Sequence, residues 1–178
     1  MCAICEFRID LAIAHPMTLS VAVATRTAIE ASSLPPFEDA APSRAIGRRN
    51  GNPLVLKALQ QRLEASLSPA TLSALPDFFV HLIERGAWAF FRATPSGFDP
   101  NCRPAPPRFD ADDPVDRDTI VVTSEFVLRQ MLLGVWRFDP ARAGGLIVID
   151  ADPWRETALA RAWAATFPLE AFSRFVCA

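Results

Sequence analysis

The C-terminal third of the chain alternates short apolar runs with helical patterns. Residues 119–123 (Thr-Ile-Val-Val-Thr) form one run, and a helical pattern begins directly after it, near Phe126. The same order returns in residues 146–150 (Leu-Ile-Val-Ile-Asp), followed by an amphipathic stretch through Leu159, Trp163 and Phe167. Strands that are apolar on both faces, each followed by a helix, are typical of a parallel sheet covered by helices. The pattern therefore predicts a C-terminal parallel β-α-β-α unit.

Further elements are expected earlier in the chain. Residues 6–13 alternate strictly between apolar and polar side chains, which indicates a half-exposed strand near a sheet edge. Leucine recurs at helical spacing after Pro53, and residues 87–93 are rich in aromatic side chains. The expected order is a strand at 6–13, a helix at 16–31, a loop at 32–52, a helix from Pro53, a helical segment from Ser73 or Pro76 to Arg85, a strand at 87–93 and a short helix at 169–178.

Length and composition favour one domain. A chain of 178 residues that is 51% hydrophobic can bury a single substantial core. We expect residues 1–178 to form one α/β domain, with helices packed on a mixed sheet of four to five strands. Prolines and aspartates dominate residues 94–118, and this segment is predicted to be a long excursion from the domain.

Charge and hydropathy exclude some partners. The net charge is -2, so the positive footprint of a nucleic-acid binder is missing. No stretch approaches the roughly 20 apolar residues of a membrane span, and charged residues interrupt the N-terminal apolar run that a secretory signal would need. We expect a cytoplasmic protein. A mean hydropathy of +0.18 is high for a monomer, which favours a homo-oligomer, although the alanine content also accounts for it.

The first candidate site is the pair Cys2-x-x-Cys5. Two thiolates at this spacing can turn toward one ion and supply half of a tetrahedral zinc site. Chain termini often lie close together, so Cys177 is the expected third ligand and His15 the fourth. The leading hypothesis is therefore a small zinc-binding protein. The alternatives are inert buried thiols and a redox pair.

A nucleophile at Cys2 is a further alternative. Removal of Met1 would make Cys2 the first residue, and its α-amino group could then act as the base for its own thiol. This arrangement resembles the N-terminal nucleophile hydrolases. The resemblance covers Met1 and Cys2 alone, and the predicted strand-helix repeat differs from the stacked antiparallel sheets of that class.

The second candidate site is the edge where the two C-terminal strands end. Ser124 follows one strand, and Asp150 and Asp152 follow the other. Ligands of open α/β sheets bind at the carboxyl ends of the strands, where helix N-termini favour anions. These residues therefore predict an enzyme or binder for an anionic or phosphorylated ligand. The alternative is that Asp152 caps the helix opened by Pro153.

The spacing Asp150-Ala-Asp152 resembles the aspartate pair of haloacid-dehalogenase phosphatases and of metal-dependent glycosyltransferases. The resemblance is confined to three residues. In the phosphatases a hydroxyl residue stands two positions after the pair, where this chain has Trp154. Their activity is therefore not transferred to this chain.

The remaining candidate residues lack the sequence motifs of known catalytic or binding sites. Ser124 and a histidine could contribute to a hydrolase triad, but no Gly-x-Ser-x-Gly motif surrounds the serine. His81 lies among large apolar residues and is predicted to be a core histidine with one hydrogen bond. A chain with 7 glycines offers no glycine-rich phosphate loop. A third hypothesis is thus an assembly protein that has no catalytic site.

Overall fold

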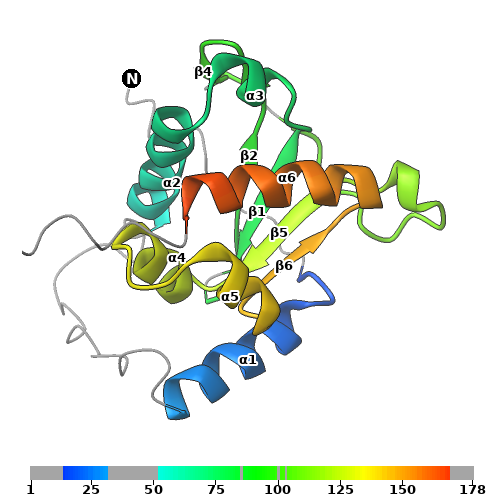
Figure 1. Ribbon diagram of the computed structural model, residues 1–178. Coiled ribbons are helices and arrows are strands. Elements are labelled where there is room, and N and C mark those ends of the chain that lie inside the picture. The colour runs from blue at the N-terminus through cyan, green and yellow to red at the C-terminus, as the bar shows by residue number, and fades with distance from the viewer. Residues whose placement is uncertain (1–13, 32–51, 85, 100, 103, 169–178) are drawn as a thin grey trace, which may run out of the picture.

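The computed structural model describes residues 14–31, 52–84, 86–99, 101–102 and 104–168. In this part of the chain helices come first, a run of strands follows, and the C-terminal part contains both (Figure 1). In chain order the elements are α1 (Thr18–Glu30), α2 (Asn52–Ser66), α3 (Pro69–Ser73), β1 (Phe78–Leu82), β2 (Ala87–Phe91), β3 (Ala93–Thr94), β4 (Gly97–Phe98), η2 (Pro114–Asp116), β5 (Thr119–Thr123), α4 (Glu125–Leu132), α5 (Phe138–Ala143), β6 (Ile147–Asp150) and α6 (Pro153–Thr166).

The main sheet has four strands in the order β2-β1-β5-β6. β1 pairs with β5 in parallel, whereas β2 and β6 pair antiparallel with their neighbours. A separate two-stranded sheet joins β3 and β4. The predicted α/β class with a mixed sheet is therefore confirmed.

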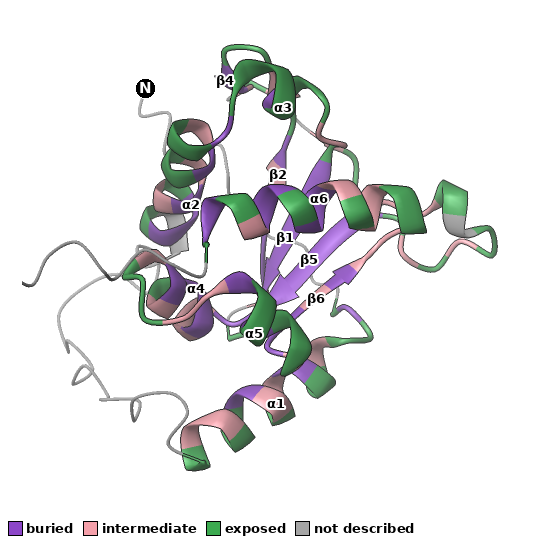
Figure 2. Ribbon diagram, in the orientation of Figure 1, coloured by how far each residue is buried: buried purple, intermediate pink, exposed green. Residues whose placement is uncertain are grey.

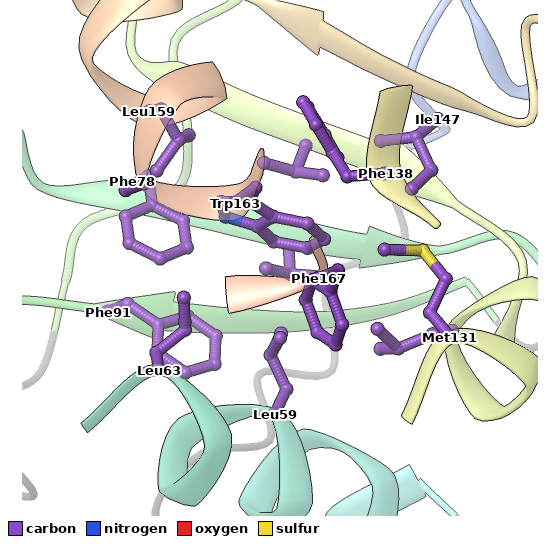
Figure 3. Packing of buried hydrophobic residues seen from close by; sticks show 14 of the residues in the cluster. Leu59, Leu63, Phe78, Phe91, Met131, Phe138, Ile147, Leu159, Trp163 and Phe167 are labelled. Atoms are coloured by element: carbon purple, nitrogen blue, oxygen red, sulfur yellow. The ribbon is translucent and has the colours of Figure 1, made fainter. Parts of the chain in front are cut away.

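One face of the sheet carries the larger core. Side chains of α2, α3, α4, α5 and α6 pack there against alternate residues of the strands. Figure 3 shows Trp163 of α6 in the middle of this core, and its ring lies 5.9 Å from that of Phe138 and 6.0 Å from that of Phe167. The leucines predicted to share one face of α2 are all buried here: Leu56, Leu59, Leu63 and Leu67. Leucine at helical spacing thus identified this helix correctly.

The other face of the sheet has a smaller apolar cluster. It is formed by the intervening residues of the strands and by one residue of α1: Phe79, Trp88, Ile120, Val122 and Val21. Phe109, from the segment that precedes β5, packs on the same cluster. α1 and this segment therefore cover the face that the other helices leave open. None of the helices in the described part of the chain is long and apolar enough to cross a membrane.

The predicted parallel pairing of the two C-terminal strands is wrong. Thr123, the last residue of β5, lies opposite Ile147, the first residue of β6, so the two strands are antiparallel. The cause is a break in the connection, because α4 ends at a turn in which Gly134 has a φ of 75°. A second helix, α5, then leads back toward β6. Two short helices return the chain to the end of the sheet that it left, whereas one long helix would have carried it to the other end.

The predicted helical segment from Ser73 or Pro76 to Arg85 is also wrong. Residues 69–73 are helical, but residues 78–82 form β1, which is buried along its whole length. A short apolar run fits a buried strand as well as a buried helix. Gly86, at a φ of 59°, forms the turn that folds β2 back onto β1. The strand expected at 87–93 is confirmed as β2, and the helix expected at 16–31 as α1.

Four predictions concern the remaining parts of the chain. The strand at 6–13 and the helix at 169–178 lie outside the described residues, as does all of the 32–52 loop except Asn52, where α2 begins. The excursion at 94–118 contains β4 and the short helix η2.

Glu64 of α2 holds the β3–β4 hairpin against the body. Its Oε1 atom accepts hydrogen bonds from the backbone N–H of Phe98, at 2.9 Å, and from the side chain of Gln60. Gly97 makes this contact possible, because a Cβ atom at that position would lie 2.7 Å from the same oxygen. Its φ of 127° also lies outside the range that other residues readily adopt.

We predict that Gly97→Ala lowers the free energy of unfolding by about 2 to 4 kcal/mol, because backbone strain and displacement of Glu64 add together. Gly86→Ala is the matched control, since a Cβ atom there has no neighbour within 4 Å and only the positive φ remains. The control is expected to lose about 1 kcal/mol. Urea unfolding measures both, and equal losses would show that the contact with Glu64 is unimportant.

Candidate functional site

A groove of about 460 Å³ lies on the face of the sheet that α1 also covers. Phe79 of β1 and Phe90 of β2 form its apolar side, with ring centroids 4.8 Å apart. Residues 104–106, which include two prolines, form another wall. We call this feature the loop groove. Its volume is in the range of small-molecule sites.

Four charged residues line the loop groove: Asp77, Arg92, Arg108 and Asp118. Asp77 and Arg92 form an ion pair at 2.8 Å, and the hydrogen bond from Arg92 to Asp77 raises the pKa of the arginine. Asp118 accepts a hydrogen bond of 2.7 Å from the backbone N–H of Arg108. The guanidinium of Arg108 makes no hydrogen bond or ion pair with another described residue, so it is the cation that a ligand can reach.

His15 and Asp150 form a pair on the face of the sheet that carries Phe79 and Ile120. The Nε2 atom of His15 is 3.1 Å from Oδ2 of Asp150, and its Nδ1 atom accepts a hydrogen bond from the backbone N–H of Met17. An Nδ1 atom that accepts carries no proton, so we assign the proton to Nε2, which donates it to Asp150. Both ring nitrogens are thus engaged, and His15 ties the start of α1 to the end of β6.

The contact with His15 changes the pKa of Asp150. The hydrogen bond from His15 lowers the pKa of Asp150, burial opposes this effect, and the positive charge of Arg117 adds to the lowering. The ring of Phe109 covers His15 at a centroid distance of 5.1 Å. The pairing of His15 with Asp150 could not be predicted from the sequence, because the two residues are 135 positions apart.

His81 is a buried histidine of β1 on the same face. Its Nε2 atom lies 3.3 Å from the hydroxyl of Thr18, and its ring stacks on Trp88 at 4.3 Å. The predicted core role with one hydrogen bond is therefore confirmed, although the residue lies in a strand. The pKa of His81 is lowered to about 4, chiefly by burial and in smaller part by the neighbouring His15, while the backbone of Ala87 acts in the opposite direction. His81 is accordingly neutral at pH 7.

Ser124 has a structural role at the start of α4. Its hydroxyl accepts a hydrogen bond of 2.9 Å from the N–H of Val127. The preceding N–H groups of Glu125 and Phe126 donate to the carboxylate of Glu84, at 2.7 and 3.2 Å. The position predicted for an external anion is thus occupied by a carboxylate of the protein itself, in accordance with the positive end of the helix dipole.

Asp152 caps α6. Its Oδ1 atom accepts hydrogen bonds from the N–H groups of Trp154 and Arg155, both at 3.1 Å, and its other oxygen pairs with the Arg155 side chain. The cap predicted from Asp152-Pro153 is therefore confirmed. The expectation that Ser124 and Asp150 share one edge is wrong, because Asp150 pairs with Ile120 near the start of β5, whereas Ser124 follows its end.

The predicted metal ligands are described only in part. Cys2, Cys5 and Cys177 lie outside the described residues, so their proximity stays a prediction. His15 is described, and its two nitrogens bind protein groups. Among the described residues, no three His, Cys, Asp or Glu side chains form a group that could hold a metal ion.

Comparisons with known protein families, with curated proteins and with solved structures give no match. The chemistry must therefore be argued from the residues themselves.

We predict that Asp150→Asn lowers the free energy of unfolding by about 1 kcal/mol at pH 7, because the ionised partner of His15 is lost. The lowered pKa of Asp150 means that the ionised carboxylate stabilises the fold above the ordinary value of 3.8, and that this contribution disappears as the pH falls through the lowered value. The difference between variant and parent should therefore shrink as the pH falls below 3.8 and through the lowered pKa of Asp150.

Urea unfolding at pH 7 and at low pH measures this difference. Asp110→Asn is the control, because Asp110 is exposed and no hydrogen bond or ion pair to another described residue is found for it. A loss of equal size in both variants would contradict a specific role for the His15–Asp150 pair.

Proposed function

We propose that this protein binds a small anionic ligand with a flat apolar body in the loop groove. The observation that carries the proposal is the arrangement of an aromatic wall, made by Phe79 and Phe90, beside the available guanidinium of Arg108. An anionic ligand was also predicted from the sequence, but at Ser124, which follows β5. The loop groove lies at the opposite end of β5, next to Asp118.

The two parts of the groove favour different parts of a ligand. Phe79 is 3% exposed, and the larger apolar area comes from Phe90, over which the guanidinium of Arg92 lies at 5.7 Å. The ion pair with Asp77 holds the Arg92 side chain in this position. Its planar guanidinium can therefore lie beside the apolar part of a bound ligand. Arg108 is exposed and can form a charge-assisted hydrogen bond with a carboxylate or phosphate.

The backbone positions Arg108 for this role. Its N–H donates to Asp118, and its carbonyl accepts from the N–H of Asp118 at 2.8 Å. These two bonds close the loop between the two residues just before β5 begins. Because its main chain is fixed on both sides, Arg108 needs little ordering when a ligand binds.

We predict that 2-naphthoate binds to the protein, and that Arg108→Ala weakens its binding about tenfold or more through loss of a charge-assisted hydrogen bond. The uncharged analogue 2-naphthalenemethanol should bind the parent weakly and be insensitive to the substitution. Isothermal titration or chemical-shift perturbation measures both affinities.

The matched control is Arg161→Ala, because Arg161 is an exposed arginine of α6 away from the loop groove. It should leave the affinity for 2-naphthoate unchanged. If both arginine variants bind 2-naphthoate like the parent, or if the parent does not bind it, the proposed function is wrong.

Zinc binding is a second proposal, supported by the spacing Cys2-x-x-Cys5. Cys177 remains the proposed third ligand, and the engagement of His15 by Asp150 favours a different group as the fourth. A homo-oligomer, a cytoplasmic location and the absence of a nucleic-acid partner likewise remain predictions from composition.

Elemental analysis of protein purified without added metal tests the zinc proposal. We expect about one zinc per chain in the parent and a large loss in Cys2→Ser, since a tetrahedral site needs its thiolates. Cys102→Ser is the control, because Cys102 belongs to the described part of the chain and lies near Arg92. A metal content near zero in all three proteins would remove the proposal.

A further inference from the structure

α1 rests on the sheet with a small apolar area. Val21 and Thr25 are the residues of this helix that are buried, and the hydroxyl of Thr25 has no hydrogen-bond partner in the described part of the chain. Figure 2 shows exposed and intermediate positions along most of the helix. Leu19 and Val23 lie on its outer side, 74% and 58% exposed. Polar contacts near its first turn therefore matter more for this helix than for those of the larger core.

Two histidines provide these contacts. His15 precedes α1 and binds Asp150 of β6, whereas His81 of β1 reaches up to Thr18 in the first turn of the helix. His81 is 1% exposed, and its Nδ1 atom forms no hydrogen bond with a described residue. A neutral ring tolerates this position. A protonated ring would carry an enclosed charge, and the backbone of Ala87, which favours the protonated form, offsets this penalty only in part.

The charged groups around His81 do not compensate a proton. The carboxylate of Asp150 is taken up by His15, and Arg117 lies near that carboxylate. β2 contributes Trp88 at this position and β5 contributes Val122, neither of which titrates. The charged residues of α1 itself, Arg26 and Glu30, pair with each other on the exposed side of the helix. A proton on His81 would therefore have no counter-ion among the described residues.

We propose that α1 is an acid-releasable cover, which leaves the sheet when His81 takes up a proton. Release exposes the apolar cluster of the second face, which includes Phe79, Trp88 and Ile120. α1 places the partly buried Ala24, Ala28 and Ile29 against the margin of the larger core, whose fully buried residues come from other elements, so we expect that core to stay intact. The proposal is independent of ligand binding in the loop groove.

The direction of the pH effect follows from linkage. The pKa of His81 is 6.5 for a free ring and about 4 in the covered state. Between pH 6.5 and pH 4, therefore, His81 binds a proton more strongly in the released state than in the covered state. The covered state is therefore fully favoured above pH 6.5 and loses this advantage as the pH falls toward 4. With these values, the equilibrium constant for release rises about 20-fold at pH 5 and about 100-fold at pH 4, relative to pH 7.

Hydrogen exchange of the full chain, followed by mass spectrometry, tests the proposal. Protection factors, corrected for the intrinsic effect of pH, are compared for peptides from α1 and from α6. In the parent, we expect protection of α1 to fall about 20-fold between pH 7 and pH 5, with α6 unchanged. His81→Gln, which has no titrating ring, should show no such fall in α1.

Thr18→Val is the matched control, because it removes the hydrogen bond but keeps the imidazole. It should weaken the protection of α1 at every pH and retain the pH dependence. An equal pH dependence in His81→Gln and the parent would overturn the proposal. So would a simultaneous loss of protection in α1 and α6, which indicates global unfolding.

A second measurement covers the case in which His81→Gln does not fold. The ring protons of His81 can be followed by NMR in the parent as the pH falls. Titration near 6.5 with α1 still protected would overturn the proposal, whereas titration that coincides with loss of α1 protection supports it. The emission of Trp88, on which the ring stacks, should change in the same pH range.

Discussion

The parallel pairing of β1 with β5 is the constraint on which the rest of the structure depends. Both strands are buried along their entire length, so apolar side chains project from both faces of the sheet. Each face must be covered, because leaving either exposed would forfeit the burial that stabilises the fold. The two covers are unequal. Among the described elements, five helices contribute buried residues on one face, while one helix and the segment around Phe109 pack on the other.

This inequality determines where chemistry is possible. The larger core is almost entirely apolar, and a polar atom buried there, the indole N–H of Trp163, has no acceptor in the described part of the chain. On the thinly covered face, histidines, a carboxylate and arginines lie among the aromatic rings. Their hydrogen bonds replace the apolar contacts that a thicker cover would supply. The loop groove and the release of α1 both follow from this arrangement.

The sequence revealed local features well and long-range ones poorly. Leucine spacing identified α2, and Asp152-Pro153 identified the start of α6, because both signals act within one helix. The direction of β6 depends on whether the chain turns back at Gly134, and this is decided by how α4 and α5 pack. The His15–Asp150 pair joins opposite ends of the chain and had no local signal. Ser124 was recognised as a possible anion site, but the carboxylate that occupies it belongs to Glu84, a residue of another element.

The strand order also has a kinetic consequence. β1 and β2 are joined by a tight turn at Gly86, so this hairpin can form early from neighbouring residues. β5 must then find β1 across the whole segment between Leu82 and Thr119, and closing that loop costs chain entropy before any apolar surface is gained. Until β5 arrives, the free edge of β1 is a row of unpaired N–H and C=O groups flanked by phenylalanines. During synthesis, this intermediate is the species most exposed to intermolecular strand pairing and aggregation.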